Sequence, residues 1–224
     1  MIETPLSTAD WSDLRARYLD ALLAGDRRRA LRLTLEDGLG RGSVRDVTRE
    51  LVQAAQREIG RLWEDNRIGI ADEHLATAIS SAVLAHLYDR AERGRELGKT
   101  IVVACVQGEL HDLPARLVAD ALDLAGFDVR FLGANVPTDA LLTALQRERP
   151  DLLALSVTMP FNVPALASAV GRLRRAASPR MPILVGGGAC AWTPTSLAAL
   201  DVDGVADDAA HAVDLARRVL EVPA

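Results

Sequence analysis

Apolar residues recur every three or four positions through the first part of the chain. This spacing covers four runs, at residues 14–23, 31–35, 47–62 and 75–87. A period close to 3.6 residues is typical of amphipathic helices. The runs are separated by breaks at residues 25–26, 38–42 and 66–70. Because these connections are short, the pattern predicts four helices in an up-and-down antiparallel bundle.

Polar residues mark two of the helix starts. Ser43 precedes the third run and is followed three residues later by Asp46, an arrangement that predicts a helix N-cap. Ala71 or Asp72 is the expected start of the fourth helix.

The pattern changes after Gly98 to short apolar runs that alternate with amphipathic stretches. We predict strands at residues 101–106, 129–132, 152–157, 183–185 and 204–206. Continuous apolar strands with helical crossovers form parallel sheets that are covered on both faces. We therefore expect two domains: an all-α four-helix bundle over residues 1–97 and a flavodoxin-like, Rossmann-like doubly wound α/β domain over 98–224.

Composition narrows the classes of function. Lys and Arg total 26 against 31 Asp and Glu, a formal net charge of −5, so no overall basic field favours nucleic acid. The chain has no apolar run of membrane-spanning length and no signal-peptide pattern. Its two cysteines, Cys105 and Cys190, lie far apart, which argues against a disulfide framework or a zinc site. We expect a cytoplasmic protein that contacts neither membrane nor nucleic acid directly.

In a doubly wound domain, ligands bind at the carboxyl ends of the strands. The loops expected there span residues 107–114, 133–137, 156–160 and 186–188. A dinucleotide site would need the spacing Gly-x-Gly-x-x-Gly after the first strand, and only Gly108 is present. These loops therefore argue against a nicotinamide or flavin dinucleotide.

The same loops carry a different set of motifs. They read Glu109-Leu110-His111, Leu132-Gly133-Ala134-Asn135-Val136-Pro137, Leu155-Ser156-Val157-Thr158 and Val185-Gly186-Gly187. Together these segments resemble the cobalamin-binding domain of corrinoid-dependent methyltransferases and cobalamin photoreceptors.

The resemblance implies that His111 replaces the cofactor's own dimethylbenzimidazole as the lower cobalt ligand, next to Asp112. Glu109 or Ser156 would accept a hydrogen bond from the distal imidazole nitrogen. Ser156 and Thr158, with Gly186 and Gly187, would line the path of the displaced nucleotide tail. Pro114 stands where the family motif has a glycine, which alters the room for that tail, although a proline fits the first turn of a helix.

A second motif lies in the helical half. Trp63 is followed, after nine residues, by Glu73 and His74. This spacing is similar to a motif found above the corrin ring in cobalamin photoreceptors of light-responsive transcriptional regulators, and corrinoid methyltransferase proteins are not expected to carry it. The resemblance implies that Trp63 packs near the upper axial group, while Glu73 and His74 contact the upper face of the chromophore.

Each residue has an alternative interpretation when it is taken alone. Trp63 could be a core or hinge packing residue, and Glu73 could stabilise the positive end of a helix dipole. His111 could cap a helix or pair with Asp112, and residues 186–188 could form only a turn. We favour the cobalamin site because these features occur together, in the right order and at equivalent loops.

The resulting hypothesis is a non-enzymatic light sensor that binds adenosylcobalamin or methylcobalamin. Its signal would leave through self-association, as a homo-oligomer, or through a protein partner, since the DNA-binding domain of the photoreceptor regulators is not expected in the few residues before the first helix. The alternatives are a corrinoid methyl carrier of a methyltransferase system, a receptor that also binds a bilin such as biliverdin, and a cobalamin store.

Overall fold

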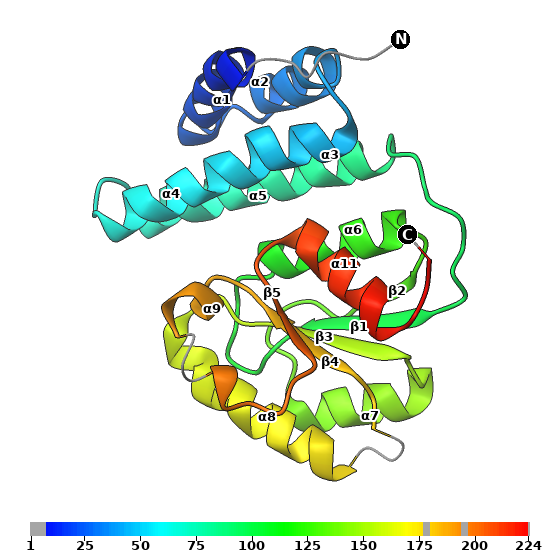
Figure 1. Cartoon of the computed structure of the whole chain (residues 1–224). Coiled ribbons are helices and arrows are strands. Elements are labelled where there is room, and N and C mark those ends of the chain that lie inside the picture. The colour runs from blue at the N-terminus through cyan, green and yellow to red at the C-terminus, as the bar shows by residue number, and fades with distance from the viewer. Residues whose placement is uncertain (1–7, 177–179, 194–196, 224) are drawn as a thin grey trace. The chain divides into compact units, whose positions relative to one another are not determined.

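A computed structural model describes residues 8–176, 180–193 and 197–223 of the chain. The chain divides into two compact units, Met1–Glu92 and Arg93–Ala224 (Figure 1). Sequence patterning placed this boundary after residue 97 instead. The segment from Gly94 to Leu97 joins the second unit because its backbone donates hydrogen bonds to Leu124 and Gly126, at 2.8 Å each.

Four continuous helical segments form the first unit over its described residues, as predicted. The first is α1 (Thr8–Leu23), and the second joins α2 (Arg27–Arg32) to a π-helical turn, η1 (Leu33–Gly38). The third runs through α3 (Val44–Val47), the π-helical η2 (Thr48–Gln53) and α4 (Ala54–Glu64), and the fourth is α5 (Ile70–Tyr88).

The starts of two helices follow from their polar residues. Ser43 caps α3, since its hydroxyl accepts a hydrogen bond from the Asp46 backbone and the Asp46 carboxylate accepts one from the Ser43 backbone. At α5, the Asp72 carboxylate accepts a hydrogen bond from the Gly69 backbone at 2.9 Å. Asp72 therefore stabilises the helix start from inside the first turn, and α5 begins at Ile70, slightly earlier than predicted.

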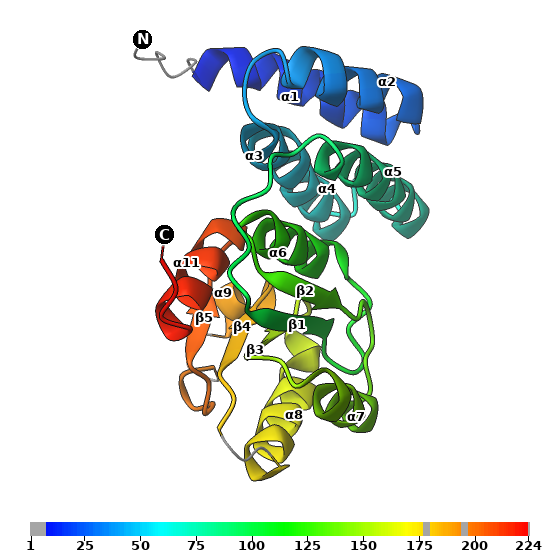
Figure 2. The same cartoon turned by 90° about the vertical axis from the view of Figure 1, so that its right-hand side faces the viewer.

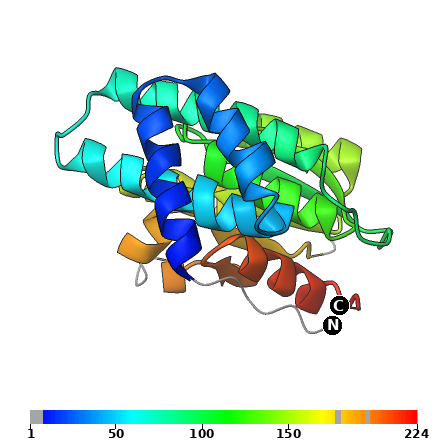
Figure 3. The same cartoon turned by 90° about the horizontal axis from the view of Figure 1, so that it is seen from above.

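The packing of these helices differs from an up-and-down bundle. Successive segments pair as antiparallel hairpins, but the α1–α2 hairpin lies across the α4–α5 hairpin (Figures 2 and 3). Helix α5 contacts α1, α2 and α4, because apolar residues cover most of its circumference. The largest fully buried side chains of the unit are Leu14, Tyr18, Leu22, Leu51, Ile59 and Leu87.

The second unit contains a five-stranded, all-parallel sheet, which confirms the predicted fold class. Its strands are β1 (Thr100–Cys105), β2 (Asp128–Phe131), β3 (Leu152–Ser156), β4 (Ile183–Gly186) and β5 (Gly204–Ala206). Their order is β2-β1-β3-β4-β5. This is the flavodoxin-like order, in which a crevice opens at the carboxyl ends of β1 and β3.

Helices cover both faces of this sheet (Figure 2). One face packs against α6 (Leu113–Leu124) and α11 (Ala209–Val219), and the other against α7 (Thr138–Glu148) and α8 (Val163–Ala176). Short helices η3 (Pro160–Asn162) and α9 (Ala189–Trp192) follow β3 and β4. Strand β1 is buried on both sides, with Ile101 and Val103 facing the first core and Val102 and Ala104 the second.

Among the described helices, none combines the length and the apolar character needed to cross a membrane.

Candidate functional site

Glu109 lies at the centre of the loops that follow β1 and β3. Its side chain is fully buried. Oε1 accepts hydrogen bonds from the backbone N–H and the Nδ1 of His111, at 3.0 and 2.6 Å. Oε2 accepts from the backbone N–H groups of Thr158 and Met159, at 2.9 Å each, and from Nδ2 of Asn162 at 3.0 Å. One carboxylate thus joins two loops at the switch point of the sheet.

These hydrogen bonds also decide the charge of Glu109. Burial raises the pKa of a carboxyl group, because the charged form loses its hydration. The hydrogen bonds from His111, Met159 and Asn162 outweigh burial and lower the pKa of Glu109 to about 2. Glu109 is therefore a carboxylate at neutral pH.

The imidazole of His111 has a defined orientation. Its Nδ1 lies against the ionised Glu109, and such an acceptor favours the tautomer whose lone pair is on Nε2. The side chain is 42% exposed, so it lies at the edge of the crevice. Of its two acidic neighbours, Glu109 receives this hydrogen bond, and Asp112 instead precedes α6 as its N-cap residue. A carboxylate-backed imidazole at a crevice is suited to binding a transition metal.

Two hydroxyl groups near this pair are buried without a hydrogen-bond partner. They are Oγ of Ser156, at the end of β3, and Oγ1 of Thr158. Sequence reasoning left Ser156 open as the partner of His111, but Glu109 has that role in the structure. Buried hydroxyl groups normally make hydrogen bonds, so this pair indicates a position where a polar ligand supplies them.

Gly186 and Gly187 follow the adjacent strand. Gly186 pairs in register with Ser156. Gly187 has φ +108°, and a Cβ atom there would lie 2.3 Å from the carbonyl oxygen of Val157. Gly187 therefore allows the loop after β4 to approach the end of β3 more closely than any other residue would. The turn at residues 186–188 needs a glycine at this position to form that close contact.

Sequence reasoning gave no role to two asparagines that organise the site. Asn162 donates to Glu109, and Asn135 accepts a hydrogen bond from the Gly108 backbone at 2.8 Å through Oδ1. The Asn135 backbone also donates to the Glu109 carbonyl at 2.8 Å. Asn135 has φ +51°, a conformation that asparagine tolerates better than most residues. Asn135 lies in the motif segment after the second strand, which could have drawn attention to it, whereas Asn162 lies outside every motif segment.

Pro114 takes the position predicted for it. It lies in the first turn of α6, one residue after Leu113. No intrahelical hydrogen bond needs its missing N–H there. The substitution of proline for the motif's glycine is thus compatible with the local backbone.

The helical unit carries the other predicted residues. Trp63 is in the last turn of α4, and Glu73 and His74 are in the first turns of α5. The turn at residues 65–69 joins these two helices, so all three residues lie at the same end of the hairpin. Trp63 is 38% exposed, which excludes the core-packing alternative. Glu73 pairs with Nδ1 of His74 and accepts a hydrogen bond from Thr77 at 2.8 Å, so its carboxylate does more than favour the helix dipole.

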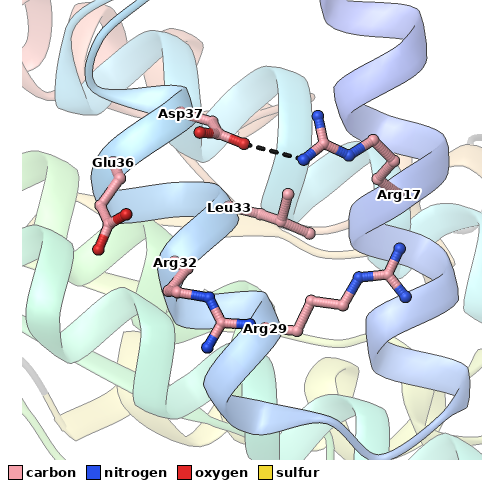
Figure 4. Close-up of a pocket in the computed structure, with 6 residues that line it drawn as sticks. All are labelled: Arg17, Arg29, Arg32, Leu33, Glu36 and Asp37. Carbon is pink, nitrogen blue, oxygen red and sulfur yellow. Dashed lines mark hydrogen bonds and ion pairs between the residues drawn. The ribbon is translucent and has the colours of Figure 1, made fainter.

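A pocket of about 230 Å³ in the helical unit has a different character. Figure 4 shows Arg17 from α1 directed at Asp37, while Arg29 and Arg32 come from α2. Arg17 and Asp37 form an ion pair at 3.1 Å. Because acidic and basic groups share the lining, the pocket offers no convergent set of donors for an anion.

Neither cysteine is poised to react. Burial raises the pKa of the Cys105 thiol to about 12 and that of Cys190 to about 11. Both are therefore protonated at neutral pH, which is unfavourable for nucleophilic attachment of a chromophore.

Two models of known protein families match the chain, one in each unit. A B12 binding domain model matches residues 99–216, and a second B12 binding domain model matches residues 14–88. The chain belongs to the B12-binding domain family. The Glu109–His111 pair and the hydroxyls of Ser156 and Thr158 thus lie within the matched B12-binding domain.

Relatives of this B12-binding protein include transcriptional repressors and corrinoid proteins. The HTH-type transcriptional repressor CarH of Myxococcus xanthus is 32% identical over 59% of this chain and 44% of its own length. Dimethylamine corrinoid protein 1 of Methanosarcina acetivorans is 24% identical over 85% of this chain and 90% of its own length. The chain spans less than half the length of CarH and of the related repressor CarA.

A solved structure has the same fold. The monomethylamine corrinoid protein of Methanosarcina barkeri superposes with a TM-score of 0.80 and 17% identity. The match covers 93% of this chain and 99% of that protein. The chain therefore has a fold that is known from a corrinoid protein.

Proposed function

We propose that this B12-binding protein is a light sensor that uses an alkylcobalamin, adenosylcobalamin or methylcobalamin, as its chromophore. The observation that carries the proposal is the motif of Trp63, Glu73 and His74 at one end of the α4–α5 hairpin. It resembles the upper-face motif of cobalamin photoreceptors, whereas His111 is shared by several classes of corrinoid protein.

The donor set of the second unit supports cobalamin. His111 offers one imidazole, oriented by an ionised carboxylate, and this residue would bind the cobalt of the cofactor. The buried hydroxyls of Ser156 and Thr158 and the close approach at Gly187 fit a polar nucleotide tail that enters past β3 and β4. These residues would hold the cofactor from below.

Bound alkylcobalamin supplies visible absorption and a weak cobalt–carbon bond that light breaks. The residues of the helical unit would respond to the upper axial group. Trp63 presents an exposed aromatic surface, and the Glu73–His74 pair presents a carboxylate and an imidazole. Loss of the upper group would remove contacts from these side chains, and a change of helix packing would follow.

The way the signal leaves the protein is part of the same proposal. The relatives at 32% and 34% identity are transcriptional repressors, but this chain spans less than half of each. We assign the output to self-association or to a protein partner rather than to direct nucleic-acid binding, because the formal net charge is −5.

A corrinoid methyl carrier is the second candidate. The dimethylamine corrinoid protein of Methanosarcina acetivorans matches 85% of this chain, a larger share than CarH does. In this alternative, His111 would hold a corrinoid that passes methyl groups between partner enzymes, and light would have no role.

The test uses the chain loaded with adenosylcobalamin or methylcobalamin in the dark. Absorption spectra and gel filtration are recorded before and after green light. A sensor changes both its spectrum and its elution, or acquires a light-dependent partner in pull-downs. Unchanged elution and no light-dependent partner, with methyl transfer from a donor protein, would establish the carrier instead, whether or not light changes the spectrum.

The same samples test for a second chromophore. Expression with biliverdin adds absorbance beyond the corrin bands if a bilin binds. Since both thiols are protonated at neutral pH, such binding would be noncovalent. A spectrum with corrin bands alone counts against the dual receptor.

A further inference from the structure

A fully buried tyrosine in α1 is connected to α5 by hydrogen bonds. The phenol oxygen of Tyr18 lies 3.3 Å from Oγ of Ser80, and both residues have no exposed surface. Ser80 also accepts a hydrogen bond from Nε2 of Gln56 in α4, at 2.7 Å. Gln56 donates in addition to the carbonyl of Ala76, at 3.3 Å. Three helices thus meet at one polar contact inside an apolar core.

The chain of contacts continues to Glu73. Oγ1 of Thr77 lies 3.1 Å from Oε1 of Gln56 and 2.8 Å from Oε1 of Glu73. The other oxygen of Glu73 contacts Nδ1 of His74. Glu73 is 17% exposed and His74 is 67% exposed, so the path runs from the surface to Tyr18. The links between Tyr18 and Glu73 have donor–acceptor distances of 2.7 to 3.3 Å, which are typical of hydrogen bonds or slightly longer.

The hydrogen-bond path is sensitive to Glu73 because Thr77 has fewer protons to donate than it has acceptors nearby. Thr77 has one hydroxyl proton, yet the carboxylate of Glu73 and the amide oxygen of Gln56 are both acceptors. Only one of them receives the full hydrogen bond at a time. When Glu73 is in place it competes with Gln56, because charged acceptors form the stronger bond. When Glu73 moves away, the proton of Thr77 turns to Gln56.

The acceptor that receives the Thr77 hydroxyl proton affects the hydrogen bonds farther along the path. A hydrogen bond to the Gln56 carbonyl polarises its amide and strengthens the bond from Nε2 to Ser80. The Ser80 hydroxyl is the neighbour of the Tyr18 phenol, so a change at Glu73 alters the surroundings of Tyr18. Helix α1 is therefore linked to the start of α5 through side chains alone.

We propose that Thr77 and Gln56 are positioning residues that hold Glu73 at the start of α5 and transmit its displacement to Tyr18 in α1. Only the assignment of Glu73 to the chromophore rests on the proposed function. The hydrogen-bond path itself belongs to the chain without cofactor, and it is tested in that form.

The first experiment uses the full chain without cobalamin, labelled at the tyrosine Cζ with ¹³C. The chain has two tyrosines, so Tyr18→Phe assigns the resonance of Tyr18. Glu73→Ala is expected to shift this resonance in the otherwise wild-type chain. Thr77→Val, which keeps the shape of the side chain without the hydroxyl, is expected to abolish the shift, and Thr77→Ser to preserve it.

Ser81→Ala is the matched control. Ser81 is the neighbour of Ser80 on α5, but its hydroxyl donates to the Thr77 carbonyl outside the path. It should leave the response of Tyr18 to Glu73→Ala unchanged. Gln56→Leu gives a second, independent break in the path. The proposal is overturned if Glu73→Ala does not move the Tyr18 resonance, or moves it equally in the Thr77→Val chain.

A second experiment loads the chain with adenosylcobalamin and illuminates it. Light is expected to shift the Tyr18 resonance in the wild-type chain but not in the Thr77→Val chain, while the cofactor spectrum changes equally in both. Equal Tyr18 shifts in both chains overturn the path. A wild-type cofactor spectrum without any light response overturns the proposed light sensor, and the cofactor-free experiment still decides the path.

Discussion

Nδ1 of His111 and Oε1 of Glu109 lie 2.6 Å apart, and the same carboxylate accepts hydrogen bonds from the loop after β3. The orientation of the imidazole is thus determined by two loops that are far apart in the sequence. Any change that weakens Glu109 as an acceptor should loosen both the ring and the loop after β3.

Glu109→Gln is expected to lower the affinity for aquocobalamin by about 10- to 100-fold, the usual effect of losing the partner of a metal-bound histidine. The amide has one acceptor oxygen, whereas the carboxylate uses both of its oxygens. Titration of the apo chain, followed by absorbance, measures the change. The control is Glu96→Gln, at an exposed position of the same unit. Equal affinities for the two variants would contradict the role given to Glu109.

Gly187→Ala should destabilise the second unit by about 2 to 4 kcal/mol, because the new methyl group would overlap the Val157 carbonyl. Gly98→Ala is the matched control. Gly98 also has positive φ, at +63°, but a Cβ there meets nothing within 4 Å. Gly98→Ala should lower the free energy of unfolding by only about 1 kcal/mol, because alanine adopts the left-handed backbone conformation less readily than glycine. Chemical denaturation compares the two, and similar losses would show that the contact with Val157 relaxes easily.

Trp63→Ala should leave cobalamin binding through His111 intact but alter the light response. Its exposed indole is the proposed contact for the upper axial group. We expect the spectral change on illumination to persist with a smaller change in elution, and Trp63→Phe to retain most of the wild-type effect. Gel filtration in dark and light provides the measurement. An elution change as large in Trp63→Ala as in the wild type would contradict the role proposed for Trp63 in the light response.

The burial of Tyr18 leads us to expect that the helical unit loses stability at high pH. Burial raises the pKa of Tyr18 to about 12, although the hydrogen bond with Ser80 opposes the shift. This pKa lies above the ordinary value of 10. The stability that protonated Tyr18 contributes to folding is therefore fully present below pH 10 and is lost as the pH rises towards 12. A shift of this size corresponds to about 3 kcal/mol.

Denaturation of the wild type, Tyr18→Phe and Tyr88→Phe across this pH range checks that contribution. Tyr18→Phe should lack part of the alkaline loss, and Tyr88→Phe should retain it. The same slope in all three proteins would mean that Tyr18 titrates normally.

Most of the fold follows from hydrophobic spacing. The four helical segments and the five parallel strands were predicted because burial dictates the period of apolar residues. The crossing of the two hairpins was not, since it depends on how α5 packs against three neighbours at once. The boundary after Glu92 depends on backbone hydrogen bonds from Gly94 and Leu97 to residues near 125, which local spacing does not reveal.

The candidate site was predicted only in part. Loop positions brought His111, Ser156 and Gly187 to one edge of the sheet, because parallel strands end together. The choice between Glu109 and Ser156 as the partner of His111 needed three-dimensional geometry. Asn162, which lies 53 residues after Glu109, had no periodicity or motif to mark it.

The most direct test concerns His111 as the lower ligand of cobalt. The chain is labelled with ¹⁵N-histidine, loaded with unlabelled cobalamin, and reduced to Co(II) for electron paramagnetic resonance. The chain has four histidines, so His111→Ala identifies the signal. If His111 binds cobalt, each superhyperfine triplet of ¹⁴N becomes a doublet in the labelled protein, and the doublets disappear in His111→Ala. Triplets that persist in the ¹⁵N-labelled protein would show that the cofactor keeps its own base, and would contradict the account.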